Sequence, residues 1–252
     1  MQIDKKFLFV SGCDRSGTTA IVRLLNEHVD ISLGMERYKG LINNSEKLKT
    51  LNKSRFEKDN FFNIKEEETN INWDYFYNKL KGKYTDSKYV GDKVPRYFQI
   101  YNHLIKEFDS AKHIFIVRDP LEVASSWKVR AEDSKDVTWA STNDVKRSVL
   151  IWNKSLEAAY KKLKSKKMDV LFVSYSSLFS GSSEALKDIL FFLDLREDEA
   201  LNSKFEEMTH DWNERTKKKS ALTDLEVEYV NQHANFKLCE HALKYSQRIL
   251  KL

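Results

Sequence analysis

The sequence predicts a three-layer α/β domain, in which a central parallel sheet carries helices on both faces. Three short apolar runs, at residues 7–10, 113–117 and 170–173, have the β-branched or aromatic content of buried parallel strands. Stretches with helical periodicity alternate with these runs, as a parallel sheet with crossover helices requires. The 252 residues suffice for one such domain with a core, so we expect a single domain over residues 1–252.

The remaining elements follow from local patterns. A weaker strand is expected at residues 89–91, and helices are expected at residues 18–28, 73–81, 97–108, 121–130, 145–164, 184–193 and 225–250. The last helix is expected to break near Ala234 and Asn235. Residues 41–72 are polar, rich in Asn and Lys and weakly periodic, which indicates an insertion or a lid.

Composition excludes several classes of protein. Hydrophobic residues make up 41% of the chain, so it is globular rather than disordered. The net charge of +5 suits an anionic ligand, but no dense basic block beyond residues 217–219 predicts nucleic-acid binding. Cys13 and Cys239 lie far apart, and they form neither a disulfide framework nor a metal-binding pair. The N-terminal apolar run is too short for a signal peptide or a membrane span, so we expect a cytoplasmic protein.

The first motif is a glycine loop between a strand and a helix. Residues 12–19 read Gly-Cys-Asp-Arg-Ser-Gly-Thr-Thr, with the G-x-x-x-x-G-x-T spacing of phosphate-binding loops. Backbone N–H groups and a helix N-terminus attract phosphate in this context. The position that carries Lys in nucleotide triphosphatases is Thr18, and the cation lies inside the loop at Arg15. ATP–Mg²⁺ chemistry is therefore less favoured than a shorter anion. The alternative interpretation is an ordinary strand–helix turn.

The second motif follows the strand at residues 113–117. Arg118 comes at the carboxyl end of that strand, Pro120 suits the first turn of a helix, and Ser126 follows Arg118 by eight residues. A phosphate monoester needs fixed donors of the kind that an Arg and a hydroxyl supply. Alternatively, Arg118 pairs with Asp119 and Ser126 is a surface hydroxyl.

Together these motifs resemble those of sulfotransferases that use 3′-phosphoadenosine-5′-phosphosulfate (PAPS), and in style they are closest to those of bacterial and protein-tyrosine members. The resemblance implies a P-loop-like fold and a product, adenosine 3′,5′-bisphosphate (PAP), with no metal. It implies that the 5′-phosphosulfate is held by Arg15, Ser16, Gly17, Thr18 and Thr19. It also implies that Arg118 and Ser126 hold the 3′-phosphate, which ATP lacks.

The resemblance also suggests the catalytic residues. Glu36 follows Arg15 by 21 residues, the spacing of the general base in protein-tyrosine sulfotransferases and several bacterial relatives. Lys93, in the pattern G-D-K-x-P-x-Y, is assigned to stabilisation of the leaving group, with Arg15 as the third catalytic residue. Steroid and phenol sulfotransferases carry a catalytic His where this chain has Pro95, which moves the base role to Glu36. Alternatively, Glu36 pairs with Arg37 and Lys93 is a surface residue.

Three further residues are weaker candidates. Tyr175 matches the tyrosine of an R-Y-E-D-L pattern and is expected to shape the cofactor pocket. Residues 210–219 resemble a late basic loop that closes over the 3′-phosphate, and Arg215 and Lys217 are candidates within it. The alternatives are core packing for Tyr175 and a solvated charge run for the late segment.

The sequence thus predicts a sulfotransferase that moves a sulfuryl group from PAPS to an acceptor hydroxyl or amine by in-line transfer, with residues 41–72 on the acceptor side. The acceptor stays open among small molecules, sugars, lipids and peptides, and the oligomeric state stays open too. One alternative is a P-loop small-molecule kinase, which predicts a Lys at position 18 and a Mg²⁺-binding carboxylate after a strand. Another is a catalytically inactive nucleotide-binding regulator, in which Glu36 and Lys93 are dispensable.

Overall fold

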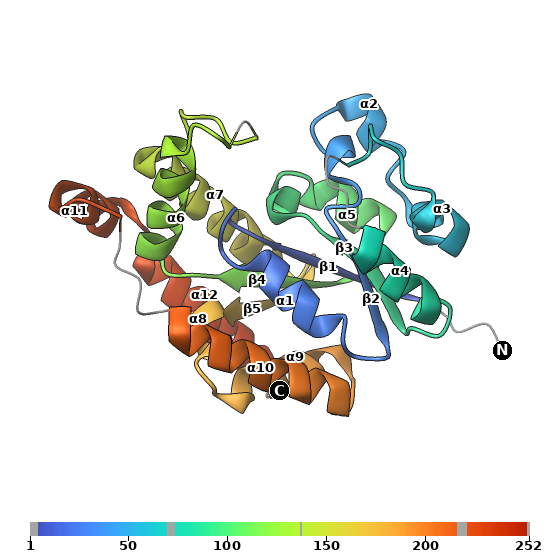
Figure 1. The fold of residues 1–252 in the computed structure, drawn as a ribbon. Helices are drawn as coiled ribbons and strands as arrows, with labels where there is room; N and C mark the ends of the chain where they lie inside the picture. The colour runs from blue at the N-terminus through green and yellow to red at the C-terminus, as the bar shows by residue number, and fades with distance from the viewer. Residues whose placement is uncertain (1–4, 70–73, 137, 216–220, 251–252) are drawn as a thin grey trace.

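The structure is a computed structural model that describes residues 5–69, 74–136, 138–215 and 221–250. At its centre is a sheet of five parallel strands in the order β2-β3-β1-β4-β5 (Figure 1). The strands are β1 (Lys6–Gly12), β2 (Ile31–Met35), β3 (Tyr89–Lys93), β4 (Lys112–Val117) and β5 (Asp169–Ser174). The predicted parallel sheet is confirmed, and the four predicted runs lie within β1, β3, β4 and β5.

Strand β2 has no apolar run to predict it, because Ser32 and Gly34 interrupt its hydrophobic residues. Ile31, Leu33 and Met35 face the same core, while the Ser32 hydroxyl bonds to the Ser87 hydroxyl at 2.8 Å. The strand is therefore held by its partner β3 and by tertiary packing rather than by its own pattern.

The predicted helices form with small shifts at their ends. They are α1 (Thr18–Leu25), α4 (Asp74–Lys83), α5 (Tyr101–Glu107), α6 (Pro120–Glu132), α7 (Val145–Lys164), α9 (Ser183–Leu193), α11 (Asp224–His233) and α12 (Phe236–Leu250). The predicted break at Ala234 separates α11 from α12. The 3-10 turn η3 (Pro95–Gln99) precedes α5, and the helices α8 (Tyr175–Phe179) and α10 (Glu199–Arg215) have no predicted counterpart.

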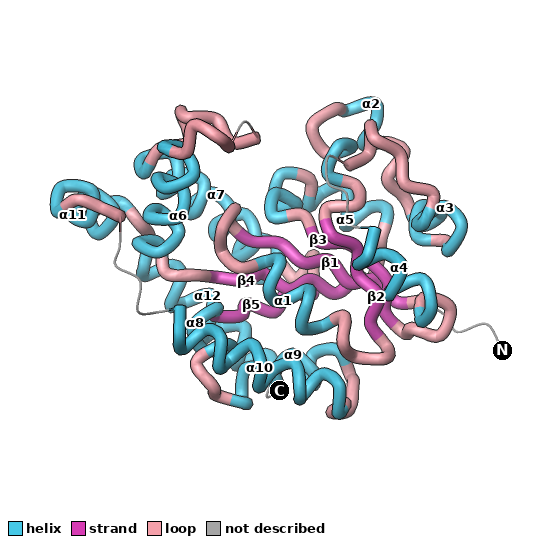
Figure 2. Tube along the Cα trace, viewed as in Figure 1, coloured by secondary structure: helices cyan, strands magenta, loops and turns pink. Residues whose placement is uncertain are grey.

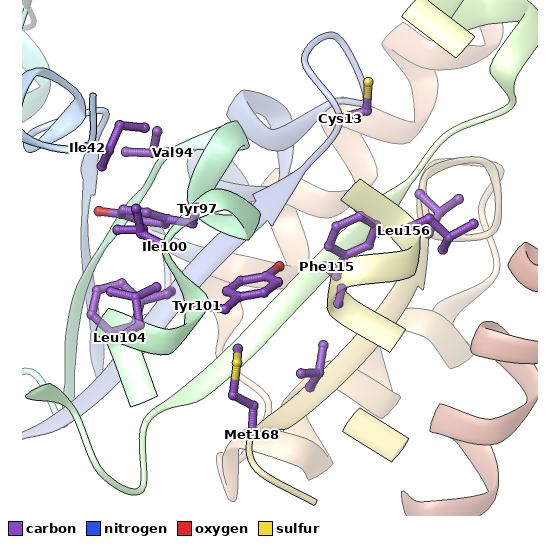
Figure 3. Packing of buried hydrophobic residues seen from close by; sticks show 14 of the residues in the cluster. Cys13, Ile42, Val94, Tyr97, Ile100, Tyr101, Leu104, Phe115, Leu156 and Met168 are labelled. Atoms are coloured by element: carbon purple, nitrogen blue, oxygen red, sulfur yellow. The ribbon is translucent and has the colours of Figure 1, made fainter. Parts of the chain in front are cut away.

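Helices cover both faces of the sheet (Figure 2). Because side chains alternate between the two faces, each face has its own core. On β1, Leu8 and Val10 pack into the core formed with α1, α8, α9 and α10, whereas Phe9 belongs to the opposite core. That second core includes residues of α5, α6, α7 and α12. Figure 3 shows part of it, with Tyr97, Tyr101 and Phe115 among its side chains. In sheets of this kind, ligands bind beyond the carboxyl ends of the strands.

The segment after β2 packs tightly on the second core. It contains η1 (Lys39–Leu41), α2 (Ser45–Leu48), η2 (Lys53–Phe56) and α3 (Lys58–Phe62). The rings of Phe56 and Phe9 meet edge to face at 5.8 Å, and Phe61 is fully buried. None of the helices in the described part of the chain has the length and apolar character that a membrane span requires.

Candidate active site

The two phosphate-binding motifs lie on neighbouring strands. Strands β1 and β4 pair in parallel, with Gly12 beside Ile116. The loop after Gly12 and the residues after Val117 therefore leave the sheet at the same edge and the same level. This register brings Arg15 and Arg118, which are far apart in the sequence, into one site.

The loop after β1 has the geometry of an anion cradle. Arg15 and Gly17 have positive φ values of 73° and 94°, so the backbone turns tightly before α1 begins at Thr18. No acidic residue lies in the first turn of α1, which leaves its N-terminus favourable for negative charge. Gly17 is required on a second count, because a Cβ atom there would lie 2.3 Å from the Tyr175 ring.

A cleft of about 450 Å³ opens beside this loop. Of the residues predicted from sequence, those that line it are Arg15, Gly17, Thr18, Thr19, Glu36, Arg118 and Tyr175. Positively charged side chains in its walls are Arg15, Arg23, Lys39, Arg118, Arg130 and Lys204. The carboxylates of Asp14, Glu36, Glu207 and Asp211 also line the cleft. Its cationic character suits an anionic ligand.

Arg15 and Arg118 connect the two motifs directly. The Nε of Arg15 donates to the Ser126 hydroxyl at 3.0 Å, and an Nη of Arg118 lies 3.4 Å from the Arg15 carbonyl oxygen. Burial, together with the nearby charges of Arg130 and Arg118, lowers the pKa of Arg15. An arginine near two other positive charges is a place where a bound anion would relieve repulsion.

Arg118 is held in place by two neighbours. Its Nε pairs with Glu122 one helical turn further along α6, and its guanidinium lies 4.8 Å above the Tyr175 ring. Asp119, the partner considered from sequence, instead caps α6 by accepting from the Leu121 N–H at 2.7 Å. The guanidinium is therefore stacked and oriented at the mouth of the loop.

Glu36 lies between two lysines at the tips of β2 and β3. Its Oε1 is 2.8 Å from the Lys93 ammonium, and its Oε2 is 2.7 Å from the Lys39 ammonium. The Lys93 side chain is 1% exposed, and its Nζ also reaches the Thr19 hydroxyl at 3.2 Å. The surface-residue interpretation of Lys93 is wrong, and so is the pairing of Glu36 with Arg37, which binds Glu68 instead.

Charge and burial act in opposite directions on this group. Burial alone would raise the pKa of Glu36, but Lys93 and Lys39 hold it below its ordinary value. Burial lowers the pKa of Lys93 despite the neighbouring carboxylate. Glu36 is therefore ionised at neutral pH, and the triad of Lys39, Glu36 and Lys93 is a compact, partly buried charge cluster beside the loop.

Three predicted residues, Ser16, Lys93 and Ser126, are not part of the cleft lining. The Ser16 hydroxyl is buried and bonds back to the Cys13 carbonyl at 2.6 Å, so it stabilises the loop. The Ser126 hydroxyl is engaged by Arg15. Tyr175 does line the cleft, and its ring also contacts Phe179.

The late basic segment needs a correction. Residues 210–215 form the end of helix α10 rather than a loop, because the apolar residues Leu201 and Phe205 anchor that helix on the sheet. Arg215 is the last residue of α10, and Lys217 lies outside the described residues. Earlier residues of α10, Lys204, Met208 and Trp212, line the cleft instead.

Sequence reasoning missed two other contributors. Lys39 lies three residues after Glu36, and its charge next to a candidate base was a usable signal. Arg130 had no such signal, because only the fold brings its guanidinium 4.6 Å above the Trp139 ring in the wall of the cleft. Trp139 itself was considered from sequence as an aromatic residue of an acceptor pocket, with core packing as the favoured alternative. The described residues hold no group of three His, Cys, Asp or Glu side chains arranged around a possible metal position.

Comparison with known proteins identifies the family of the chain. A family model described as "Sulfotransferase family" matches residues 8–199, which is most of the chain. A comparison of the sequence with curated proteins finds no significant match.

Solved structures resemble the fold at low sequence identity. A sulfotransferase domain from the curacin biosynthetic pathway has a TM-score of 0.51 at 20% identity, over 79% of this chain and 77% of its own. Sulfotransferase STF1 from Mycobacterium tuberculosis has 0.53 at 15%, over 92% and 76%. Mouse SULT7A1, solved with PAP, has 0.50 at 14%, over 86% and 67%. At these identities the likeness concerns the fold.

Proposed function

The chain belongs to the sulfotransferase family and is therefore a transferase, and from this premise we propose that it moves a sulfuryl group from PAPS to an acceptor hydroxyl or amine. One observation carries the proposal. The loop of Arg15 and the guanidinium of Arg118 line the same cleft, and an Nη of Arg118 lies 3.4 Å from the Arg15 carbonyl. One nucleotide with anionic groups at both ends of its ribose can reach both.

The residues present fit such a cofactor. The N-terminus of α1, with Arg15, Thr18 and Thr19, lines the cleft where a 5′-phosphosulfate would be held. Arg118 and Ser126 are the residues that would hold the 3′-phosphate, with Arg15 bonded to Ser126 between the two ends. PAP bound to mouse SULT7A1, a protein of similar fold, is consistent with this proposal.

When bound, PAPS supplies the sulfuryl group and a phosphate leaving group, and the chain supplies the acid–base and electrostatic functions. Glu36 is ionised and faces the cleft, so it can accept the proton of the acceptor. Lys93 reaches both Glu36 and Thr19, which places its ammonium between the base and the phosphate loop. From there it can neutralise charge that develops on the leaving oxygen.

Lys39 gives Glu36 a second counter-ion from the half-exposed side of the cleft. Because Lys93 would shift toward the phosphate loop, the remaining pair with Lys39 would keep Glu36 ionised until it takes a proton. The described part of residues 41–72 begins two residues after Lys39, so we place the acceptor on that side of the cleft. Trp139 and Pro95 also line the cleft and offer flat apolar contacts.

A P-loop kinase is the main alternative. It requires a Lys where this chain has Thr18, and a carboxylate for Mg²⁺ after a strand. Asp119 follows β4, but its carboxylate caps α6. Arg118 and Ser126 would then have no role. An inactive regulator is the other alternative, and it leaves the Lys39–Glu36–Lys93 cluster without a purpose.

Calorimetric titration separates these functions. We expect PAP to bind in the micromolar range, about −8 kcal/mol, and ADP with Mg²⁺ to bind far more weakly. Arg118→Ala should weaken PAP binding about 10- to 100-fold, the loss of one charge-assisted phosphate contact. Arg147→Ala, which removes an exposed arginine from α7, is the matched control and should leave binding unchanged. A preference for ADP–Mg²⁺ would favour the kinase.

Turnover tests the base. Once an acceptor has been found by screening hydroxyl and amine compounds with PAPS, Glu36→Gln should lower kcat by about 100-fold or more. Its affinity for PAP should change little, because Glu36 contacts the lysines rather than Arg15 or Arg118. Equal losses in turnover and affinity would exclude Glu36 as the base, and full activity would favour a different base.

A further inference from the structure

A single buried carboxylate lies behind the charge cluster. Asp92 is the residue before Lys93 on β3, and it has no exposed surface. Four donors converge on it. Its Oδ1 accepts the N–H groups of Arg37 at 3.0 Å and Lys93 at 2.8 Å, and its Oδ2 accepts the Tyr38 N–H at 3.0 Å and the Tyr97 hydroxyl at 2.9 Å.

Three of these donors are backbone N–H groups next to the proposed base or of its lysine. Arg37 and Tyr38 directly follow Glu36, and the third N–H is that of Lys93 itself. A further bond, from the Glu36 N–H to the Lys93 carbonyl at 2.8 Å, closes the connection between the two strand tips. The carboxylate therefore fixes the distance between the backbones that carry Glu36 and Lys93.

The turn at Glu36 needs such support. Glu36 has a φ of 58°, a left-handed conformation that a non-glycine residue adopts only when its surroundings impose it. Two successive N–H groups directed at one carboxylate impose this turn, because they must both point inward. Gly34 leaves room for the carboxylate, since a Cβ atom there would lie 2.7 Å from Asp92 Oδ1.

We infer that Asp92 is a positioning residue, which holds the Glu36 turn against Lys93 so that the 2.8 Å pair between their side chains forms at the mouth of the phosphate loop. The inference rests on the proposed function, because it gives Asp92 a role only if Glu36 and Lys93 carry out the transfer. Asp92 is not part of the cleft lining, so we expect its effect on the transfer to pass through these two residues.

A neutral residue would fill the same space with less cost to folding. Burial raises the pKa of Asp92 to about 6, even though the hydrogen bonds from Arg37, Tyr38 and Tyr97 and the Lys93 charge favour the ionised form. The four donors around Asp92 need two accepting oxygen atoms, which a carboxylate supplies and an amide does not. Asparagine has only one oxygen, and its NH₂ group would face two donors.

The test is a double-mutant cycle on turnover with PAPS and an identified acceptor. Asp92→Asn should lower kcat by about 100-fold, the effect of misplacing a catalytic group by about 1 Å, while the Kd for PAP stays within about twofold. In a Glu36→Gln background Asp92→Asn should lower kcat by less than about threefold, because the base that Asp92 positions is already absent. Tyr97→Phe, which leaves the three backbone donors in place, should cost less than Asp92→Asn.

If the kcat losses of Asp92→Asn and Glu36→Gln add up in the double variant, the inference about Asp92 fails while the proposed function stands. A loss of PAP affinity as large as the loss of kcat in Asp92→Asn would have the same consequence. A Glu36→Gln variant with full turnover would overturn the proposed base and, with it, this inference. If Asp92→Asn does not fold, amide hydrogen exchange in the unaltered protein decides. The Arg37 and Tyr38 amides should then exchange as slowly as those inside β3, and exchange as fast as in exposed loops would refute the inference.

Discussion

The Nε of Arg15 donates a hydrogen bond of 3.0 Å to the hydroxyl of Ser126, and so joins the loop after β1 to helix α6. The two residues come from separate sequence motifs, each predicted to hold one end of the same nucleotide. Their contact means that the ends are not independent. A change at Ser126 would alter the orientation of Arg15, whose pKa is lowered by burial and by the nearby charges of Arg130 and Arg118.

Removal of the Ser126 hydroxyl should therefore weaken PAP binding modestly. Ser126→Ala deletes one donor and frees the Arg15 side chain, and we expect about a fivefold loss of affinity, or about 1 kcal/mol. Ser125→Ala is the matched control, because the neighbouring hydroxyl accepts from the Ala221 N–H and does not reach Arg15. Calorimetric titration of both variants decides the matter, and equal losses would argue against a role for the Arg15–Ser126 pair.

The second lysine of the charge cluster should set the acid limb of the pH–rate profile. Lys39 helps to hold the pKa of Glu36 below its ordinary value, so Lys39→Met should raise that pKa. Because the proposed base works only when it is ionised, the acid limb of kcat/KM should move to higher pH. Lys47→Met, on the exposed surface of α2, should leave the profile unchanged. A shift to lower pH would contradict the base assignment.

The segment after β2 should depend on one buried carboxylate. Glu68 is 2% exposed and pairs with Arg37, which is fully buried, and with Arg55. Glu68→Gln leaves the Arg37 charge buried without its counter-ion, and we expect the free energy of unfolding to fall by about 3 kcal/mol. Glu67→Gln, at the exposed neighbouring residue, is the control, and it should change the free energy of unfolding by less than about 0.5 kcal/mol. Denaturant unfolding measures both, and a small effect at Glu68 would suit a loosely attached lid.

Buried His113 should make the protein sensitive to acid. Burial lowers its pKa to about 3, below the ordinary value of 6.5, and its Nδ1 has no hydrogen-bond partner among the described residues. Between pH 6.5 and 3 the unfolded chain binds a proton that the folded chain refuses, so this group removes stability as the pH falls. His113→Phe should keep the stacking on Phe9 and remove that loss.

The measured quantity is the free energy of unfolding of His113→Phe minus that of the natural chain. This difference should be about 2 kcal/mol more favourable to the variant at pH 5 than at pH 7, since 1.5 pH units lie between 6.5 and 5, at about 1.36 kcal/mol each. Urea unfolding at the two pH values measures this difference. His241→Phe replaces an exposed histidine and should show no such dependence on pH. A gain at His113 that is equal at both pH values would instead reflect packing.

The sequence was sufficient wherever structure is local. The apolar strand of residues 7–10, the glycine loop and the start of α1 are consecutive, so their order alone indicated an anion cradle. The runs that became β4 and β5 are short and almost entirely buried on both faces, which makes their patterns legible. Helix α7 was predicted with its observed ends, because its apolar face repeats over twenty residues.

Strand β2 and helix α10 could not be predicted from local patterns in the same way. Strand β2 has Ser32 and Gly34 within five residues, and only pairing with β3 and packing on both sides make it a strand. In α10 a few buried residues, such as Leu201 and Phe205, anchor an otherwise polar helix. Their stability comes from surfaces that distant segments provide, and no local pattern records those surfaces.

The sequence by itself determined the fold class, the family and the two strand tips at which charge gathers, because motifs of consecutive residues carry that information. Only the tertiary structure decided that Arg15 meets Ser126, that Lys39 and Lys93 enclose Glu36, and that Asp92 lies behind that pair. The physical reason is that these contacts depend on the register of parallel strands. The packing of the whole core sets that register, and a one-residue slip would turn each of these side chains to the opposite face.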